Sequence, residues 1–309
     1  MSVSAAPVLM LIFNRPDLTA RVFESVRAAK PSKLYLACDG PRNLAELQLV
    51  KDCQRVVSEV DWPCEVFTLY RPHNLGCKVA VSEAITWFFE HEEAGIILED
   101  DVLPVPEFFE FMNKALVEYR DKLWVGAVSG MSLIDEVDQS GQALCRSTAF
   151  PMIWGWGTWR RVWEKYRVEL PAHCGTSLDP VLTDFRLTSS LFVECWATIF
   201  DNLKSGAMNT WDYQLNYLFL KEDLRCVLPT VPLVDNIGYD PRATHTTGLL
   251  PNWLLKPSQR SEIRFNFKVT RRDDLMDELI LDRVFHVNRF RKIKHFIKNV
   301  LRFLRLYKN

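Results

Sequence analysis

Short apolar runs alternate with longer amphipathic stretches over the first 130 residues of the chain. Short apolar runs that end in polar or turn-forming residues are typical of buried strands, whereas apolar residues three or four positions apart are typical of helices. The pattern therefore predicts strands at residues 7–13, 33–38, 65–70 and 95–98. It predicts helices between them at residues 18–29, 44–60 and 77–90, the first with Asp17 as its N-cap.

Strands that alternate with helices of this length favour an α/β fold, with a mostly parallel sheet and helices on both faces. In such a sheet, ligands bind beyond the carboxyl ends of the strands. Polar residues follow each predicted strand, and we expect them to converge on one edge of the sheet. They are Asn14-Arg15, Asp39-Gly40, the segment from Arg71 through Asn74 to Gly76 with Lys78 beyond it, and Glu99-Asp100-Asp101.

The acidic turn at Glu99-Asp100-Asp101 is the main candidate for a metal site. A bend after Asp100 would let Asp101 meet a cation while Asp100 or Glu99 accepts hydrogen bonds from sugar hydroxyls. Mg²⁺ and Mn²⁺ favour carboxylate and phosphate oxygens, and three adjacent carboxylates repel one another unless a cation is present. The alternative is that these are solvated acids that cap the strand or open a helix at Glu107.

Two further polar residues are candidates for chemistry. Asp212, in Trp211-Asp212-Tyr213, could act as a general base on a hydroxyl group, or it could be the N-cap of a helix that begins near Tyr213. His245 could reach a metal or a diphosphate from a loop, or it could be solvated there.

Tryptophan and glycine alternate from Trp154 to Trp159. Glycines allow a tight turn, and flat rings along a wall suit the faces of sugars, so Gly155, Trp156 and Gly157 are candidate binding residues. The alternative is a turn in the core with aromatic packing. The chain has no dinucleotide-binding glycine fingerprint and no P-loop consensus.

The net charge of −1 hides an asymmetry. Residues 283–309 carry nine Lys or Arg and no acid, so the rest of the chain has 29 basic and 39 acidic residues. Apolar residues at helical spacing between these cations predict a basic amphipathic helix within a C-terminal extension at residues 256–309. We expect it to lie on an anionic membrane surface; the alternative is a helix that docks on the acidic body or on another subunit.

Eight cysteines are scattered without a C-x-x-C pair, which is typical of reduced core cysteines in a cytosolic protein. No segment approaches the roughly 20 apolar residues of a transmembrane helix. We therefore expect no membrane span, and we expect no nucleic-acid partner.

The motifs, taken in order, resemble metal-dependent glycosyltransferases of the GT-A fold, and among them the N-acetylglucosaminyltransferase I type and its bacterial relatives. The likeness covers most of residues 7–248 and is most specific from Gly95 to Phe109. The eukaryotic members of this family carry an N-terminal membrane anchor, which this sequence does not show. Tyr213 departs from the pattern, because a second acid often stands there in the family.

The resemblance implies a role for each motif. Arg15 would approach the donor diphosphate, and Asp39 would meet the uracil ring. Asp101 would ligate the metal, while Glu99 and Asp100 hold the ribose and the donor sugar. Asp212 would be the catalytic base. The segment from Phe150 to Gly157 resembles a loop beneath the donor sugar, and the segment from Asn236 to Gly248, with His245, resembles a loop that closes over it.

These observations predict one GT-A domain at residues 1–255, with a nucleotide-binding half at about 1–125 and an acceptor-side half at 126–255. The predicted activity is inverting transfer of a sugar from a UDP-sugar, with Mn²⁺ or Mg²⁺, to a hydroxyl of a glycan or lipid-linked glycan. Bacterial surface polysaccharide or glycoconjugate synthesis, in the cytoplasm or at the inner face of the membrane, is the expected setting. Arg71, Asn74 and Lys78 are further candidate contacts to the nucleotide sugar.

Two alternatives remain. A sugar nucleotidyltransferase could share the fold and the metal, but it normally has a Gly-rich loop after the first strand, where this chain has Asn14-Arg15-Pro16. A non-catalytic carbohydrate-binding or interaction protein would also use aromatic rings, but it would need neither the carboxylate cluster nor a candidate base.

Overall fold

The computed structural model describes residues 5–176, 179–239, 251, 253–258 and 263–287. A nine-stranded sheet runs through the described chain in the order β11-β7-β9-β6-β8-β4-β1-β2-β3. The strands are β1 (Val8–Ile12), β2 (Lys33–Cys38), β3 (Glu65–Tyr70), β4 (Ala94–Glu99), β6 (Val125–Ser129), β7 (Gln142–Thr148), β8 (Trp156–Trp159), β9 (Arg225–Pro229) and β11 (Arg264–Asn266).

The sheet is mixed but mostly parallel. Neighbours β3, β2, β1 and β4 are parallel, as are the pairs β6–β9 and β7–β11. Strand β8 is antiparallel to both β4 and β6, and β7 is antiparallel to β9. The predicted α/β class, a Rossmann-like and mostly parallel sheet flanked by helices, is therefore confirmed.

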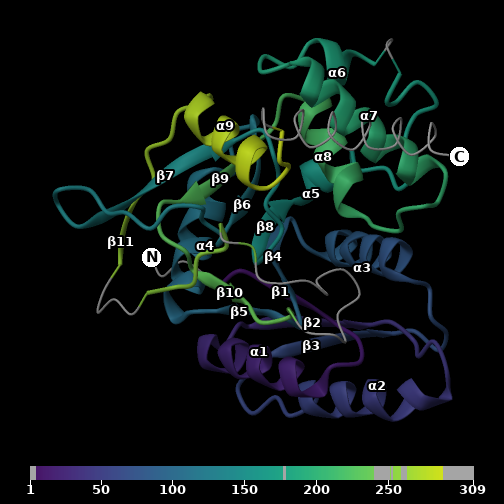
Figure 1. Ribbon diagram of the computed structural model, residues 1–309. Helices are drawn as coiled ribbons and strands as arrows, with labels where there is room; N and C mark the ends of the chain where they lie inside the picture. The colour runs from purple at the N-terminus through teal and green to yellow at the C-terminus, as the bar shows by residue number, and fades with distance from the viewer. Residues whose placement is uncertain (1–4, 177–178, 240–250, 252, 259–262, 288–309) are drawn as a thin grey trace, which may run out of the picture.

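Helices cover both faces of the first half of the sheet. Figure 1 shows α1 (Pro16–Ala29) and α2 (Leu44–Val57) on one side of β1, β2 and β3, with α3 (Cys77–His91) on the other. The strand β1 is fully buried, as expected for a central parallel strand with helices on both sides. The remaining helices are α4 (Pro106–Glu118), α5 (Arg160–Trp163), α6 (Pro180–Thr183), α7 (Ser190–Lys204), α8 (Asp212–Lys221) and α9 (Asp274–Arg283).

The prediction of Asp17 as the N-cap of the first helix is wrong. The helix begins at Pro16, and Arg15 occupies the N-cap position without a side-chain capping bond. Proline is favoured at the first helical position because its fixed φ suits the helix and its missing N–H would have had no partner there. Asp17 instead lies in the first turn, where its charge is favourable near the positive end of the helix dipole.

A second, two-stranded sheet supports the acidic turn. The chain turns at Asp100 and Asp101, and β5 (Val102–Pro104) then pairs antiparallel with β10 (Val234–Asn236). The backbone N–H of Ile237 also donates to the carbonyl of Asp101 at 2.8 Å. The bend that the sequence predicts after Asp100 is therefore present, and the segment after β10 holds it in place.

The described part of the C-terminal extension packs on the sheet. β11 pairs with β7, and α9 lies against β7 in Figure 1. Asp277 on α9 is fully buried and accepts hydrogen bonds from Thr148 Oγ1, the Ala149 N–H and Arg225 Nη1 at 2.8, 2.7 and 3.1 Å. The predicted basic amphipathic helix falls on residues 288–309, which lie outside the described residues.

None of the described helices is both long and apolar enough to span a bilayer. All eight cysteines lie in the described part of the chain, and no disulfide joins any of them.

Replacing Asp277 tests how firmly α9 is anchored. Asp277→Ala would leave the guanidinium of Arg225, which is 3% exposed, without its buried carboxylate partner. Loss of one partner of a buried ion pair costs about 3–5 kcal/mol, so the free energy of unfolding should fall by that order. Urea unfolding measures it, with Glu278→Ala, at an exposed position of the same helix, as control. Equal stability of the two variants would contradict the anchoring role.

Candidate functional site

A cavity of about 560 Å³ lies at the carboxyl ends of β1, β2 and β4. This is the edge at which the polar residues were expected to converge. Most of the predicted site residues line it together: Arg15, Asp39, Arg71, Asn74, Glu99, Asp100, Asp101 and Asp212. Phe13, directly before Asn14-Arg15 in the motif that carries the resemblance, also lines it, as do Cys77 and Thr210, which no motif marks. Each lies within two positions of a predicted site residue, which is the signal that could have identified them.

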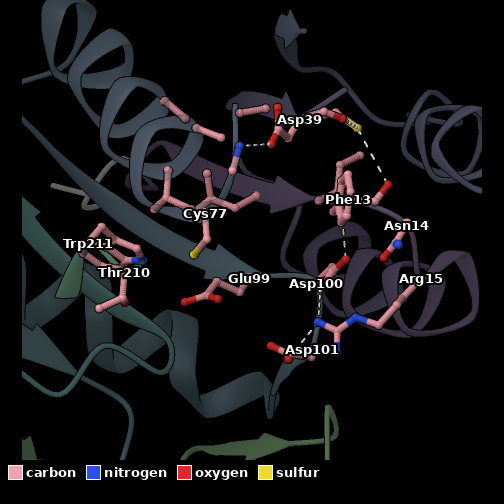
Figure 2. A pocket seen from close by; sticks show the side chains of 18 of the residues that line it. Phe13, Asn14, Arg15, Asp39, Cys77, Glu99, Asp100, Asp101, Thr210 and Trp211 are labelled. Carbon is pink, nitrogen blue, oxygen red and sulfur yellow. Dashed lines mark hydrogen bonds and ion pairs between the residues drawn. The ribbon is translucent and has the colours of Figure 1, made fainter. Parts of the chain in front are cut away.

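One arginine joins two of the three acids. The Nη2 atom of Arg15 lies 2.7 Å from Asp100 Oδ1 and 2.8 Å from Asp101 Oδ2. Figure 2 shows this guanidinium between the two carboxylates. Asp100 and Asp101 are 5% and 8% exposed, so both are largely removed from water. Buried carboxylates need a positive partner, and Arg15 supplies the one that holds this turn together.

Arg15 does not neutralise the whole cluster. Glu99 turns its carboxylate away from Arg15, toward Thr210 and Trp211 (Figure 2). Burial, together with the charges of Asp101, Asp100 and Asp212, raises the pKa of Glu99 to about 8. Burial also raises the pKa of Asp100 to about 6, against the opposing effect of Arg15. Arg15 contacts only two of the four acids Glu99, Asp100, Asp101 and Asp212, and the other two arginines of the lining, Arg42 and Arg71, are paired with Glu46 and Glu83.

This surplus of carboxylate fits a divalent cation. Hard cations such as Mg²⁺ and Mn²⁺ take oxygen ligands and often share them with a bound phosphate. Within the described residues, no three His, Cys, Asp or Glu side chains are arranged to enclose a metal ion. A cation at Asp101 would thus need phosphate or water oxygens to complete its shell. His245, the other predicted metal ligand, lies outside the described residues.

The segment after β10 closes tightly on Asp101. A Cβ atom on Gly238 would lie 2.1 Å from Asp101 Oδ2, which is less than any real contact allows. Only glycine leaves room for the carboxylate at this position. The orientation of Asp101 is therefore set from one side by Arg15 and from the other by the backbone at Gly238.

Asp39 holds the loop that follows β3. Its Oδ1 accepts from the N–H groups of Gly40 and Leu75 at 2.8 and 2.9 Å. Its Oδ2 accepts from Asn74 Nδ2 at 2.9 Å and from the Gly76 N–H at 3.0 Å. A carboxylate offers about four lone-pair positions, and all are used here. A uracil ring would have to displace one of these donors to bind Asp39.

The side chains of the Trp-Gly segment point in different directions. Gly155 has φ +59°, a left-handed conformation that glycine adopts without strain. Trp154, before it, lines the cavity, whereas Trp156, after it, is 1% exposed and stacks on Trp211 with ring centroids 5.8 Å apart. Gly157 lies within β8. Both interpretations of this motif thus describe part of it: one ring faces the cavity, and the other packs in the core.

Asp212 is the first residue of α8, not its N-cap. Trp211 occupies the N-cap position without a side-chain capping bond, and the hydroxyl of Thr210 donates to Asp212 Oδ1. Asp212 lines the cavity together with Glu99 and Cys77, and its charge contributes to the raised pKa of both. The N-cap interpretation is therefore wrong, and Asp212 carries its carboxylate into the site.

Two predicted contacts are engaged elsewhere. Lys78 Nζ lies 2.8 Å from Glu169 Oε1 and is not among the residues that line the cavity. Arg71 does line it, but its Nη2 lies 2.6 Å from Glu83 Oε2. Either cation would have to leave a half-exposed or exposed glutamate before it could bind a phosphate.

No protein-family model and no curated protein sequence matches the chain. Solved structures do show similarity. HddC from Yersinia pseudotuberculosis is 10% identical with a TM-score of 0.33, over 53% of this chain and 82% of its own. A UDP-glucose pyrophosphorylase complexed with UDP-glucose is 9% identical with a TM-score of 0.33, over 72% and 89%. The 4-diphosphocytidyl-2C-methyl-D-erythritol synthase from Anaerococcus prevotii DSM 20548 is 9% identical with the same TM-score, over 64% and 99%.

These similar structures do not support the predicted likeness to the N-acetylglucosaminyltransferase I type. Similarity at this level carries no argument about activity, so the function has to be argued from the site itself.

The raised pKa of Glu99 makes stability depend on pH. Because its pKa in the folded protein, about 8, exceeds the ordinary 4.5, the folded state retains a proton that the unfolded chain loses. This contribution to stability is complete below pH 4.5 and is lost as the pH rises through about 8. Between these two pH values the free energy of unfolding should fall by up to about 1.4 kcal/mol per pH unit because of Glu99. Glu99→Gln should remove this slope.

Urea unfolding at several pH values without divalent cations measures the effect. Glu90→Gln, at an exposed position of α3, is the control and should keep the wild-type slope. The same slope in Glu99→Gln would show that the carboxyl of Glu99 titrates normally.

Asp39→Asn tests the closure of the loop from Arg71 to Gly76. The new amide group would face backbone N–H donors, and an unsatisfied buried donor costs about 1–3 kcal/mol. We expect the free energy of unfolding to fall by about that much, and hydrogen exchange at the amides of residues 74–76 to become faster. Urea unfolding and hydrogen exchange measure the two effects. Asp138→Asn is a matched control, because Asp138 closes a distant loop through the N–H groups of Ser140 and Gln142. Faster exchange at residues 74–76 in both variants would contradict a local role for Asp39.

Proposed function

We propose that the chain is a metal-dependent glycosyltransferase that moves a sugar from a UDP-sugar to a hydroxyl of a glycan or lipid-linked glycan. One observation carries this proposal. A single cavity holds the acidic turn with its arginine and, from a different element, a separate carboxylate at Asp212. Glycosyl transfer by inversion needs both parts: a place for the leaving diphosphate and a base for the incoming hydroxyl.

The donor side is formed by Arg15 and the acidic turn. Asp101 would hold a Mn²⁺ or Mg²⁺ ion, which neutralises charge on the departing diphosphate when it is bound. Arg15 would keep its place beside Asp100 or turn one N–H toward a phosphate oxygen. Glu99 and Asp100 would accept hydrogen bonds from hydroxyl groups of the ribose and the donor sugar.

The acceptor side is formed by Asp212. Its carboxylate would take the proton of the acceptor hydroxyl as the oxygen attacks the anomeric carbon and the bond to UDP breaks. Attack from the side opposite the leaving group inverts the anomeric centre.

Sugar nucleotidyl transfer is the second candidate, since it could share the fold and the metal, and a UDP-glucose pyrophosphorylase is among the similar structures. Its nucleophile is a sugar phosphate, which is already anionic and needs no base. The chain also has Asn14-Arg15-Pro16 directly after β1, where a Gly-rich loop is normal for such enzymes. Release of UDP from a UDP-sugar with Mn²⁺ would support glycosyl transfer. Release of pyrophosphate from UTP and glucose 1-phosphate would support nucleotidyl transfer. A protein that does neither but binds UDP-sugars would be a binding module.

We further propose that residues 283–309 attach the protein to an anionic membrane surface, where lipid-linked acceptors occur. Arg283, the first cation of this segment, donates to the carbonyl of Leu133 at 3.1 Å, so the start of the segment is held by the body. Sedimentation with anionic liposomes, with and without residues 288–309, would separate this role from a docking helix.

Isosteric variants of two acids test the division of roles. Asp212→Asn should lower the rate of UDP release from a UDP-sugar by about 10²–10⁴-fold, the typical contribution of a general base, with UDP affinity nearly unchanged. Asp101→Asn should weaken UDP binding about 10- to 100-fold in Mn²⁺ and much less in EDTA. Calorimetry and a coupled UDP assay measure both. A large loss of UDP affinity in Asp212→Asn would assign Asp212 to the donor side. If UDP binding is independent of Mn²⁺ in both the wild type and Asp101→Asn, the role of Asp101 as a metal ligand would be contradicted.

A further inference from the structure

Two stacked pairs of aromatic rings lie behind the turn that carries Asp212. The ring centroids of Trp156 and Trp211 are 5.8 Å apart, with an angle of 22° between the ring planes. Those of Trp163 and Tyr166 are 4.2 Å apart, with an angle of 9°. The ring centroid of Trp163 also lies 6.3 Å from that of Trp211. All four are at most 7% exposed. We call Trp156, Trp163, Tyr166 and Trp211 the aromatic clamp.

Hydrogen bonds connect the clamp to the turn. The hydroxyl of Tyr166 donates to the backbone carbonyl of Trp211 at 3.0 Å, and Gln214 Nε2 donates to the carbonyl of Thr210 at 2.9 Å. Burial raises the pKa of Tyr166, so this hydroxyl stays protonated and can donate. On the far side, Trp163 Nε1 donates to Thr86 Oγ1 on α3 at 3.0 Å. The turn is thus fixed to β8 and to α3.

The turn needs this support because α8 lacks the usual one. Most helix starts are fixed by a side chain at the N-cap, whereas the N-cap residue here, Trp211, makes no such bond. Asp212 follows it directly, so the position of its carboxylate depends on how the backbone of Trp211 is held. A misplacement of about 1 Å in a reacting group can cost about 10²-fold in rate.

We propose that Tyr166 is a positioning residue for Asp212, and that it acts by holding the Trp211 carbonyl while Trp156 and Trp163 of the aromatic clamp fix the Trp211 ring. This rests on the proposed function, in which Asp212 is the base. Thr210 completes the arrangement, because its hydroxyl donates to Asp212 Oδ1 and sets the rotation of the carboxylate. The Trp-Gly motif thereby serves the chemistry through Trp156, a ring that does not line the cavity.

Tyr166→Phe tests the proposal, since it keeps the ring stacked on Trp163 and removes only the hydroxyl. The assay is hydrolysis of UDP-glucose, UDP-galactose and UDP-N-acetylglucosamine in Mn²⁺, with water as the acceptor. We expect kcat to fall about tenfold with KM for the UDP-sugar unchanged, as for loss of alignment without loss of donor binding. Hydrogen exchange at the amides of residues 210–214 should become faster. Thr210→Val should also lower kcat, and Thr210→Ser, which restores the hydroxyl, should recover it.

Tyr119→Phe is the matched control. Tyr119 is equally buried and donates to the carbonyl of Phe267 at 2.8 Å, but it does not line or neighbour the cavity. It should change neither kcat nor exchange at residues 210–214.

The outcomes separate the two proposals. If hydrogen exchange at residues 210–214 is unchanged in Tyr166→Phe, the claim that Tyr166 holds this turn would be overturned. Faster exchange with an unchanged kcat, while Asp212→Asn is inactive, would overturn the positioning role. A wild-type protein that hydrolyses none of the three UDP-sugars, or an Asp212→Asn variant as active as wild type, would contradict the proposed function and with it the role of Tyr166. Hydrogen exchange would still report on the clamp in that case.

Discussion

The contact on which the site depends is the shared bond of Arg15 to Asp100 and Asp101. One guanidinium holds two buried carboxylates, and the third acid of the turn, Glu99, points away from it into the cavity that Asp212 also lines. Without Arg15, the turn after β4 would place uncompensated charge at the carboxyl edge of the sheet. With Arg15 in place, two of the three carboxylates of the turn share one positive charge, so negative charge remains in excess there. That excess is the reason for proposing that a cation binds here and brings a diphosphate with it, and it links the fold to the proposed chemistry.

The first half of the fold could be predicted because its signals are local. Strands β2 and β3 begin and end where the pattern of apolar residues places them, and β1 and β4 differ by only a residue or two at their ends. The insertion of β8 between β4 and β6 could not be predicted, since a tryptophan-glycine alternation has no strand signature of its own. The pairing of β11 with β7 depends on contacts between residues more than a hundred positions apart, which no local pattern reveals.

The candidate site could be predicted in outline, because residues after parallel strands meet at one edge. Its details required the structure. Asp39 is occupied by the loop that it holds, Lys78 is paired with Glu169, and Trp156 faces the core. Each of these residues has the right chemistry for a ligand, but packing decided where its side chain points. Asp212 shows the opposite case: at a helix start a capping role was the simpler interpretation, and the backbone geometry places its carboxylate in the cavity instead.

The most direct test of the account is a crystal structure with Mn²⁺ and UDP. We predict an ion bound to Asp101, the diphosphate against that ion and within reach of Arg15, and Asp212 on the open side of the anomeric position. Empty density at the acidic turn, with both bonds from Arg15 to Asp100 and Asp101 unchanged and UDP bound elsewhere or not at all, would contradict it.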